Sequence, residues 1–600
     1  MEVTPFQHRL HQLASASLVL LIVLCVLWEL VLAPLRPGGS WMVIKALPLL
    51  APLPGTLRRN VYTMQWASMM VLMYFTEGVV RAWSEQGLSQ LLAGAEIVFS
   101  TLYFFAAIFS CGLTSVRQSD LRKRPCNAPP SPMSDEFLSQ CAQRIGARHV
   151  LTGDDMAGYL TDWRRRFTGR ARAVLRPGST KEVAMLVQLC VAHRVPIVPQ
   201  GGNTGLVLGS VPDDSGHAVV LSLSRLHRLR EVDVINNTLT AEAGCTLHQV
   251  QQAAEAHGRL FPLSLASEGS CSIGGNLATN AGGTAVLRYG NARELTLGLE
   301  VVTAQGDVWH GLRGLRKDNT GYDLRDLFIG SEGSLGIITA AVLKLFALPA
   351  ARATALFALA SVSDALNLLS LARTRCDANL TGFELMSDFC LQLVERHFST
   401  QRLPFAQRYP QYVLMELSTT EPEAHAIAQL EAVASRAIET SIAHDVIMAT
   451  SLSQSKALWG LREHISEAQA SEGKNIKHDV ALPISAVQNF IVDTDAELQH
   501  AFPGCRMVTF GHLGDGNLHY NVSAPAGQDD ESFLTQQEAI NRIVHDRVHH
   551  YGGSISAEHG IGALKRQEIL RYKTETEMAM MIAIKRALDP LNLMNPGKVV

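Results

Sequence analysis

Apolar residues dominate the first 116 residues of the chain and fall into runs long enough to cross a bilayer as helices. Residues 13–35 and 88–113 each reach the length of about 20 residues that a spanning helix needs, and residues 62–82 form a third candidate. Residues 41–54 are fewer and contain Pro48, Pro52 and Pro54, which indicates a broken fourth span or a re-entrant segment. Further apolar runs follow the first and no small-residue cleavage site is evident, which disfavours a signal peptide. The pattern predicts a domain of about four transmembrane helices.

Basic residues are distributed unevenly around these spans. If the domain has four spans, its two ends lie on the same side of the membrane. The larger set of basic residues then lies on that side: Arg9, Arg58, Arg59, Arg117, Arg122, Lys123 and Arg124. The smaller set on the opposite side is Arg36 and Arg81. The positive-inside rule then predicts a multi-pass protein of the bacterial inner membrane whose remaining domains face the cytoplasm.

Three carboxylates, Glu29, Glu77 and Glu96, lie inside or near the ends of the spans, where a charge is costly. They either sit at the membrane interface and face one another, or form a quinone or proton site. The segments YTMQWAS (62–68) and YFTEGV (74–79) resemble a small bacterial inner-membrane family of unknown function. This resemblance supports a membrane location and implies no chemistry.

The pattern changes after the spans. Residues 117–136 are polar and proline-rich and predict a semi-rigid linker. Short strands and helices then alternate, with strands expected at 173–175 and 195–198 and a helix at 182–193. We expect one soluble domain over 137–350 and a second over 351–600.

Composition narrows the class of protein. Six hundred residues are too many for one hydrophobic core. A net charge of −3 with 18% charged residues gives no sign of nucleic-acid binding. None of the ten cysteines forms a CxxC pair, which argues against iron–sulfur clusters and zinc ribbons and suits a reducing compartment.

Glycine clusters indicate a large ligand that lies against the backbone. The strand expected at 195–198 runs into PQGGNTG (199–205), where backbone N–H groups could approach phosphate oxygens. Residues 262–283 carry five glycines, a content that we expect to exclude an ordinary helix or strand interior. Residues 330–339, GSEGSLGIIT, form a third glycine-rich stretch, before a strand.

A possible metal site lies in GHLGDGNLHYN (511–521) and SAEHG (556–560). His512 and His519 are seven residues apart and would face opposite sides of a straight strand, but a turn at residues 514–516 would aim both at one point. Two histidines and the carboxylate of Glu558 suit a divalent transition metal, whereas a histidine pair alone is as well explained by structure. Asn521 would share the face of His519.

Three further side chains are candidates for carboxylate binding. A helix around 459–466 would place Arg462 and Ser466 on one face, and Lys477 falls in a strand expected at 475–482. They could bind an acid, or they could be solvated surface groups.

Taken together, residues 172–600 resemble the FAD-binding flavoproteins of the vanillyl-alcohol oxidase (PCMH) type. The resemblance is to the branch containing D-lactate dehydrogenase, the glycolate oxidase flavin subunit and D-2-hydroxyglutarate dehydrogenase. It implies an α+β fold: a PCMH-type FAD-binding domain of two subdomains, followed by an α+β FAD-linked oxidase C-terminal domain. An all-α transmembrane segment precedes both.

The resemblance also implies which residues hold FAD. The residues for the pyrophosphate are Pro199, Gly201, Gly202, Asn203, Thr204, Gly205, Ser270, Gly275, Asn276, Asn280 and Gly283. Glu332 and Ile338 would lie near the adenosine half, and Asn595 would return to the flavin. Covalent relatives carry a histidine after the Gly-Gly pair, and Asn203 stands there in this chain, so we expect non-covalent FAD.

For the reaction, the resemblance implies metal ligation by His512, His519 and Glu558, with zinc favoured and manganese, cobalt or iron also suitable. It assigns His559 as general base, and the substrate contacts to Arg462, Ser466, Lys477 and Asn521. A D-2-hydroxy acid would lose its hydroxyl proton to His559 and a hydride to flavin, and electrons would pass to a quinone or another carrier. A homodimer is compatible with this arrangement.

Alternatives stay open at this point. An O2-using oxidase, a membrane redox sensor or transport protein with a flavin domain, and an alkyl-ether-lipid flavoenzyme would share many of these features. The residues do not distinguish D-lactate from D-2-hydroxyglutarate.

Overall fold

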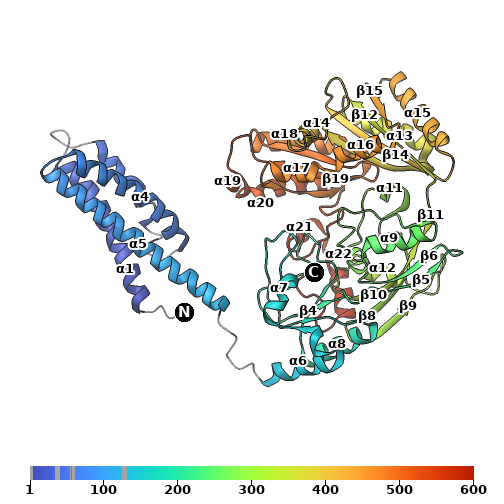
Figure 1. Cartoon of the computed structure of the whole chain (residues 1–600), viewed down its shortest axis with the longest axis horizontal. Coiled ribbons are helices and arrows are strands. Elements are labelled where there is room, and N and C mark those ends of the chain that lie inside the picture. Colours follow the sequence, from blue (N-terminus) through green and yellow to red (C-terminus); the bar gives the residue numbers. More distant parts are fainter. Residues whose placement is uncertain (1–4, 34–40, 54–55, 57–60, 124–131) are drawn as a thin grey trace. The chain divides into compact units, whose positions relative to one another are not determined.

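The structure, a computed structural model, describes residues 5–33, 41–53, 56, 61–123 and 132–600. The chain divides into two compact units, Met1–Ser131 and Pro132–Val600 (Figure 1). Several sequence-based expectations concern residues outside the described ranges: those for Arg36, Arg58, Arg59, Arg124, Pro54, Pro125, Pro129 and Pro130.

The N-terminal unit is helical. Helix α1 (Pro5–Leu27) continues into a π-helical turn, η1 (Trp28–Leu32), and is followed by η2 (Trp41–Ala46) and α2 (Leu47–Leu50). Two long helices, α4 (Val61–Ser84) and α5 (Leu88–Lys123), complete the described part, and α5 packs against both α1 and α4. Buried apolar residues such as Leu18, Leu21 and Val71 line the contacts between these helices.

Two segments of this unit are long and apolar enough to cross a membrane, Gln12–Leu32 and Leu88–Ala107. The third candidate span, residues 62–82, lies within helix α4. The fourth, residues 41–54, begins with the short elements η2 and α2. The linker expected at 117–136 is wrong at its start, because α5 continues to Lys123. Residues 115–123 contain neither glycine nor proline, so nothing in the sequence stops the helix there.

The second unit begins with the FAD-binding region. Helix α6 (Pro132–Ile145) and α8 (Thr180–His193) cover a four-stranded sheet of order β1-β2-β4-β3. Its strands are β1 (Val150–Leu151), β2 (Val174–Leu175), β3 (Ile197–Gln200) and β4 (Val219–Ser222), with α7 (Ala157–Leu160) between β1 and β2. The expected helix at 182–193 is confirmed, and the strand expected at 195–198 begins two residues later.

A five-stranded antiparallel sheet of order β5-β6-β10-β8-β9 forms the second subdomain. Its strands are β5 (Leu229–Asp233), β6 (Thr238–Glu242), β8 (Thr296–Thr303), β9 (Val308–Gly311) and β10 (Gly336–Lys344). The helices are α9 (Leu247–Ala256), α10 (Ile273–Thr279), α11 (Val286–Tyr289) and α12 (Leu324–Phe328). A small ribbon of β7 (Arg259–Leu260) and β11 (Phe346–Ala347) leads to the next domain.

The C-terminal domain is a sheet with helices on both faces (Figure 1). Seven of its strands follow the order β15-β12-β14-β13-β18-β19-β16, and β17 also pairs with β19. The strands are β12 (Ala351–Leu359), β13 (Leu380–Ser387), β14 (Gln411–Thr419), β15 (Asp445–Met448), β16 (Asn475–Ile476), β17 (Asp479–Ala481), β18 (Arg506–His512) and β19 (Asn517–Ser523).

The helices of this domain fall into two layers. One face of the sheet packs against α13 (Val362–Cys376), α15 (Glu423–Glu439), α18 (Val487–Ala501) and α20 (Gln537–His550). The other packs against α14 (Asp388–His397), α16 (Leu452–Glu463) and α17 (Ile465–Ser471). The short helix α19 (Asp530–Leu534) precedes α20.

The last part of the chain returns to the FAD-binding region. After α21 (Ile569–Tyr572) and α22 (Glu575–Leu588), Met594 forms a bridge with Ile197 of β3 and is buried in the core of the first subdomain. The backbone N–H of Asn595 donates to the Ile197 carbonyl at 2.7 Å.

One local expectation is wrong. The glycine-rich segment 262–283 contains a helix, α10, which Ser272 caps and in which Gly274 lies directly against Ala243, where a side chain would not fit. The helix expected around 459–466 is present but divides into α16 and α17 at His464, whose ring nitrogen Nδ1 lies 2.6 Å from the Gly460 carbonyl oxygen. A further expectation is only partly met, since the strand at 475–482 is interrupted at residues 477–478.

Candidate functional site

A cavity of about 500 Å³ opens between the two FAD-binding subdomains and reaches the C-terminal domain. Most residues expected to hold FAD line it: Pro199, Gly201, Gly202, Asn203, Thr204, Gly205, Ser270, Gly275, Asn276, Glu332 and Ile338. Glu558 and His559 line the same cavity. The cofactor region and the candidate catalytic region are therefore continuous.

The cavity wall is made largely of backbone. A Cβ on Gly202 would lie 2.1 Å from the Ser270 carbonyl oxygen, and one on Gly201 would lie 2.2 Å from Ser272 Oγ. The Ser272 hydroxyl accepts from Gly202 N at 3.2 Å and from Gly275 N, at the start of α10, at 3.4 Å. These contacts hold a bare, N–H-rich surface of the kind that binds a pyrophosphate.

Asparagines fix the edges of this cradle. Asn203 has a φ of +54° and donates to the Thr161 carbonyl at 2.9 Å. Asn595 donates to the Gly209 and Glu332 carbonyls, at 2.9 and 2.7 Å, while its buried Oδ1 has no partner in the structure. A cavity lined by glycine backbone, two of whose lining residues are bonded by an asparagine with an unsatisfied amide oxygen, fits a large polar cofactor such as FAD.

Two expected cofactor residues have structural partners outside the cavity lining. Asn280 ends α10 with a φ of +54°, and its Oδ1 accepts from Arg293 N at 3.0 Å. Gly283 has a φ of +120°, and a Cβ there would lie 2.0 Å from the Ser264 carbonyl oxygen.

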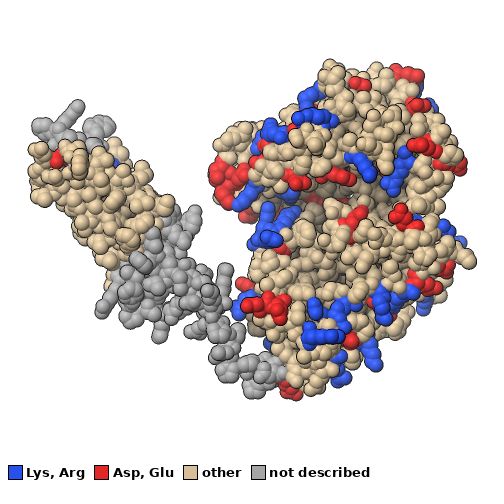
Figure 2. Space-filling view, viewed as in Figure 1, with Lys and Arg blue, Asp and Glu red and all other residues tan. Residues whose placement is uncertain are grey.

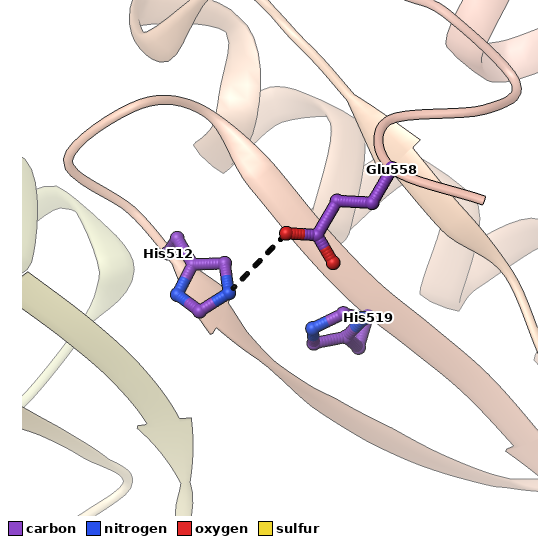
Figure 3. A group of neighbouring side chains, drawn as sticks. All are labelled: His512, His519 and Glu558. Carbon is purple, nitrogen blue, oxygen red and sulfur yellow. Dashed lines mark ion pairs between the residues drawn. The ribbon is translucent and has the colours of Figure 1, made fainter. Parts of the chain in front are cut away.

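The two histidines of the candidate metal site lie on a β-hairpin. Strands β18 and β19 pair Phe510 with His519 and His512 with Asn517, which places both histidines on one face. The expected turn is confirmed, with Gly516 at a φ of +84°. Glu558 approaches from a separate loop, and its Oε1 lies 4.0 Å from His512 Nε2 (Figure 3).

These three side chains fit a metal ion. One ligand atom from each of His512, His519 and Glu558 lies within 4.8 Å of the others, as two nitrogens and one oxygen. Such a set, with an open coordination position, suits zinc and other first-row divalent metals. Asp479, Glu558 and His559 meet the same distance test, so Glu558 belongs to both groups.

Glu384, on β13, is a site residue that the sequence did not indicate. Its fully buried carboxylate accepts from His512 Nδ1 at 2.7 Å and from Arg462 Nε at 2.8 Å. Despite burial, these partners lower the pKa of Glu384 to about 2, while Glu384 outweighs burial and raises the pKa of His512 to about 9. The arrangement favours a positive charge at His512, whether proton or metal, and directs Nε2 away from Glu384.

Asp479, on β17, is a second site residue that the sequence did not indicate. Its Oδ2 accepts from the backbone N–H groups of Glu558 and His559, at 2.9 and 3.2 Å. Its Oδ2 is also 3.5 Å from His559 Nδ1, and its Oδ1 is 3.7 Å from His519 Nδ1. Burial opposes ionisation, but the two histidines and the N–H groups lower the pKa of Asp479 well below its usual range. One carboxylate thus positions both the candidate base and a candidate ligand.

The loop of Glu558 and His559 is also tied to the FAD-binding domain. Glu332 has a φ of +52°, and its carboxylate accepts from Ile561 N and Gly562 N at 2.7 and 2.8 Å. A Cβ on Gly282 would lie 2.9 Å from Glu558 Oε1. Burial raises the pKa of Glu558 and lowers that of His559.

The expected substrate residues differ in their surroundings. Arg462 is buried, lies 4.8 Å from the Phe510 ring and is already paired with Glu384. Asn521 is buried, donates to Gln469 Oε1 at 2.8 Å and accepts from His478 N at 3.2 Å. Ser466 and Lys477 are exposed. The structure therefore does not bring Ser466 into the buried cluster around Arg462.

Two arginines that the sequence did not indicate, Arg164 and Arg166, lie near Lys477. Although Lys477 is solvent-exposed, crowding by protein atoms lowers its pKa to about 8, with Arg164 and Arg166 contributing. The loop that carries both arginines is held by the Asp162 carboxylate, which accepts from Arg164 N, Arg166 N and Phe167 N. Figure 2 shows Lys and Arg side chains gathered near the groove between the FAD-binding and C-terminal domains.

Comparison with protein families matches three parts of the chain. Residues 348–599 match the FAD linked oxidases, C-terminal domain, and residues 171–311 match an FAD binding domain. Residues 13–113 match a family described as a predicted membrane protein (DUF2069).

Several relatives cover most of the second unit. The D-2-hydroxyglutarate dehydrogenase of Xanthomonas citri pv. viticola is 39% identical over 470 residues, or 78% of this chain and 97% of the relative. The mitochondrial D-2-hydroxyglutarate dehydrogenase of Arabidopsis thaliana is 37% identical, over 78% of this chain and 82% of the relative. The enzyme of that name from Stutzerimonas stutzeri is 36% identical, over 75% of this chain and 96% of the relative.

Solved structures with lower identity share the fold. p-Cresol methylhydroxylase has a TM-score of 0.62 at 15% identity and covers 79% of this chain and 98% of its own. Alkyldihydroxyacetonephosphate synthase has a TM-score of 0.59 at 17% identity, over 79% of this chain and 86% of its own. The PCMH-type fold expected from the sequence is confirmed. By its relatives and its FAD-linked domains, the chain belongs to the D-2-hydroxyglutarate dehydrogenase family of FAD-dependent 2-hydroxy-acid dehydrogenases.

Proposed function

We propose that this protein is a membrane-anchored, metal-assisted dehydrogenase that oxidises a D-2-hydroxy acid of the 2-hydroxyglutarate type to the 2-oxo acid. The observation that carries the proposal is the continuity of the glycine-lined cavity with Glu558 and His559, beside the candidate ligands His512 and His519. A cofactor, a metal and a base can all reach one substrate at this point.

The chain offers a distinct set of groups to each component. FAD, bound without a covalent link in the cavity, supplies the acceptor for a hydride from C2 of the substrate. A divalent ion, most simply zinc, held by His512, His519 and Glu558, supplies a Lewis acid for the substrate's hydroxyl and carboxylate oxygens.

His559 is the proposed general base. Asp479 Oδ2 lies 3.5 Å from its Nδ1 and favours a proton there, which leaves Nε2 to accept the hydroxyl proton of the substrate. Burial lowers the pKa of His559, so the ring is neutral and able to accept a proton at neutral pH. Asp479 then stabilises the imidazolium that forms.

The cations support a substrate with two carboxylates. Arg164, Arg166 and Lys477 carry no ion pair with a carboxylate in the described part of the chain, although their charges act on the same site. Arg462 lies beside the metal ligands and retains guanidinium N–H groups that Glu384 does not use. A dicarboxylate would compensate positive charge at both places, whereas D-lactate could compensate only one.

The membrane part of the proposal rests on the match of residues 13–113 to predicted membrane proteins and on the apolar helices. We propose several spans, with the dehydrogenase facing the cytoplasm. Electrons would then leave for a membrane quinone, although a soluble carrier would serve the same chemistry.

The proposal is tested by anaerobic reduction of the bound flavin. Purified protein is mixed with D- and L-2-hydroxyglutarate and with D- and L-lactate, before and after treatment with a chelator. We expect bleaching of the flavin band by D-2-hydroxyglutarate, loss of bleaching after chelation, and recovery with added metal.

Other outcomes select the alternatives. Stoichiometric peroxide in air without any other acceptor would identify an oxidase. Bleaching by none of these acids would support a redox sensor or a lipid substrate, and bleaching that survives chelation would leave the histidine pair with a structural role. Faster turnover with a quinone analogue than with soluble dyes would support the proposed acceptor.

A further inference from the structure

Six charged side chains meet inside the N-terminal unit, where η1, η2, α4 and α5 converge. Lys45 Nζ lies 2.7 Å from Glu77, 3.5 Å from Glu96 and 3.7 Å from Glu29. Arg81 lies 2.6 Å from Glu29, 3.4 Å from Glu77 and 2.8 Å from Glu85. The Trp28 ring lies against both cations, at 4.6 Å from Lys45 Nζ and 3.9 Å from Arg81 Cζ.

The cluster contains more negative than positive groups. Four carboxylates face two cations among the side chains that the structure describes. Glu77 and Glu85 are each 26% exposed, but Glu29 and Glu96 are 0% exposed. Two cations cannot neutralise four buried or half-buried carboxylates, and an uncompensated charge at such a depth is strongly unfavourable.

The excess negative charge can be assigned to two carboxylate oxygens. Oε2 of Glu29 and Oε2 of Glu96 are buried and have no hydrogen-bond partner in the structure, whereas Oε1 of each is paired. A buried carboxylate oxygen with no donor is unfavourable, but the same oxygen carrying a proton is no longer charged. The two unpartnered oxygens are thus the places where a bound cation would lie.

The neighbouring polar groups are already engaged. The Cys25 thiol donates to Glu96 Oε1 at 3.6 Å, the Tyr74 hydroxyl donates to the Lys45 carbonyl at 2.6 Å, and the Ser89 hydroxyl donates to Glu85. None of these donors reaches the Oε2 atoms. Glu77 and Glu85, each 26% exposed, share Lys45 and Arg81 with the buried pair and so offer a route for proton exchange with the surface of the unit.

We propose that this cluster is a proton-binding site in the membrane unit, with its exchangeable protons at the unpartnered Oε2 atoms of Glu29 and Glu96. The proton is favoured over a metal cation because Lys45 lies 3.5 Å from Glu96 and 3.7 Å from Glu29, so a second fixed cation would be repelled. The inference concerns this unit alone and does not rest on the proposed dehydrogenase reaction.

The test uses an apolar carbodiimide, N,N′-dicyclohexylcarbodiimide, which adds to protonated carboxyl groups in apolar surroundings. The full-length protein in detergent is treated over a range of pH, and the modified glutamates are identified by peptide mass spectrometry. We expect modification of Glu96 near neutral pH and its loss at alkaline pH, by about tenfold for each pH unit once the group titrates.

Controls make each outcome decisive. Glu85, which is paired with Arg81 and Ser89, should remain unmodified, and Glu96→Gln should abolish the Glu96 adduct while the protein keeps its FAD. Protein unfolded at acidic pH should be modified at all four glutamates, which shows that each adduct is detectable. Absence of the Glu29 and Glu96 adducts in the folded protein, or their suppression by Na⁺ or K⁺ at constant pH, would overturn the proposal.

Discussion

The glycine-lined cavity and the candidate metal site meet at Glu558 and His559 but are built in opposite ways. The cavity wall is largely backbone, made accessible by glycines such as Gly202 that exclude side chains. The candidate metal site is made of charged side chains from separate strands and loops, held by the buried carboxylates of Glu384 and Asp479. Substitutions should therefore act on the cavity through shape and on the candidate metal site through charge.

The largest effect should come from the proposed base. We expect His559→Asn to lower the rate of anaerobic flavin reduction by about 10²- to 10⁴-fold, because no group remains to accept the hydroxyl proton. FAD and metal content should be unchanged, since the ring is not among the proposed ligands. A variant that reduces flavin within a few-fold of the wild type would show that another group is the base.

Glu384 should control the metal through charge. Glu384→Gln keeps the size of the side chain but removes the negative charge between His512 and Arg462, and we expect metal affinity to fall about 10- to 100-fold. Metal titration followed by elemental analysis would measure the change. Glu416→Gln is the matched control, because Glu416 is also buried, on the neighbouring strand β14, but bonds Trp459.

Glycine substitutions should separate shape from charge. In Gly202→Ala the new Cβ would lie 2.1 Å from the Ser270 carbonyl oxygen, and we expect FAD affinity to fall about tenfold or more. Gly269 also lines the cavity, but a Cβ there meets nothing within 4 Å. Gly269→Ala should therefore retain FAD, and equal loss from both variants would contradict the steric explanation.

Arg164 should affect substrate choice more than rate. We expect Arg164→Ala to lower kcat/KM for D-2-hydroxyglutarate about tenfold and to change it little for D-lactate, because one charged hydrogen bond to the second carboxylate is lost. Arg165→Ala, at the adjacent exposed position, is the control. Equal loss for both acids would place Arg164 outside substrate selection.

The smallest effect should be a pH dependence of KM. Lys477 has a pKa lowered to about 8, so its ammonium is present below that pH and is lost above it. We expect KM for the dicarboxylate to rise a few-fold as the pH increases through about 8. Lys477→Arg keeps the charge and should flatten this rise, which steady-state kinetics would show.

The same contrast explains what the sequence could predict. The glycine clusters at 199–205 and 262–283 are contiguous in sequence, so they indicate a glycine-lined cavity, although they do not indicate the short helix α10. The β18–β19 hairpin can also be predicted from a short stretch of sequence, because its turn glycines lie between the two histidines. The sequence does not indicate the last turns of helix α5, because their polar composition resembles that of a linker.

The supporting carboxylates could not have been found in this way. Glu384 reaches His512 only because β13 pairs with β18, across 128 residues of sequence. Asp479 reaches His519 because β17 pairs with β19, and each of these acidic residues alone resembles any other strand residue. Arg164 likewise lies on a loop of the FAD-binding domain, and no local pattern indicates that this loop approaches Lys477.

The return of Met594 and Asn595 to β3 has a consequence for biogenesis. The cradle formed around β3 gains its last hydrogen bonds, to Ile197, Gly209 and Glu332, only from residues near 595. During synthesis those residues leave the ribosome after every other part of the cradle. Completion of the flavin site would then be a late step that needs nearly the whole chain.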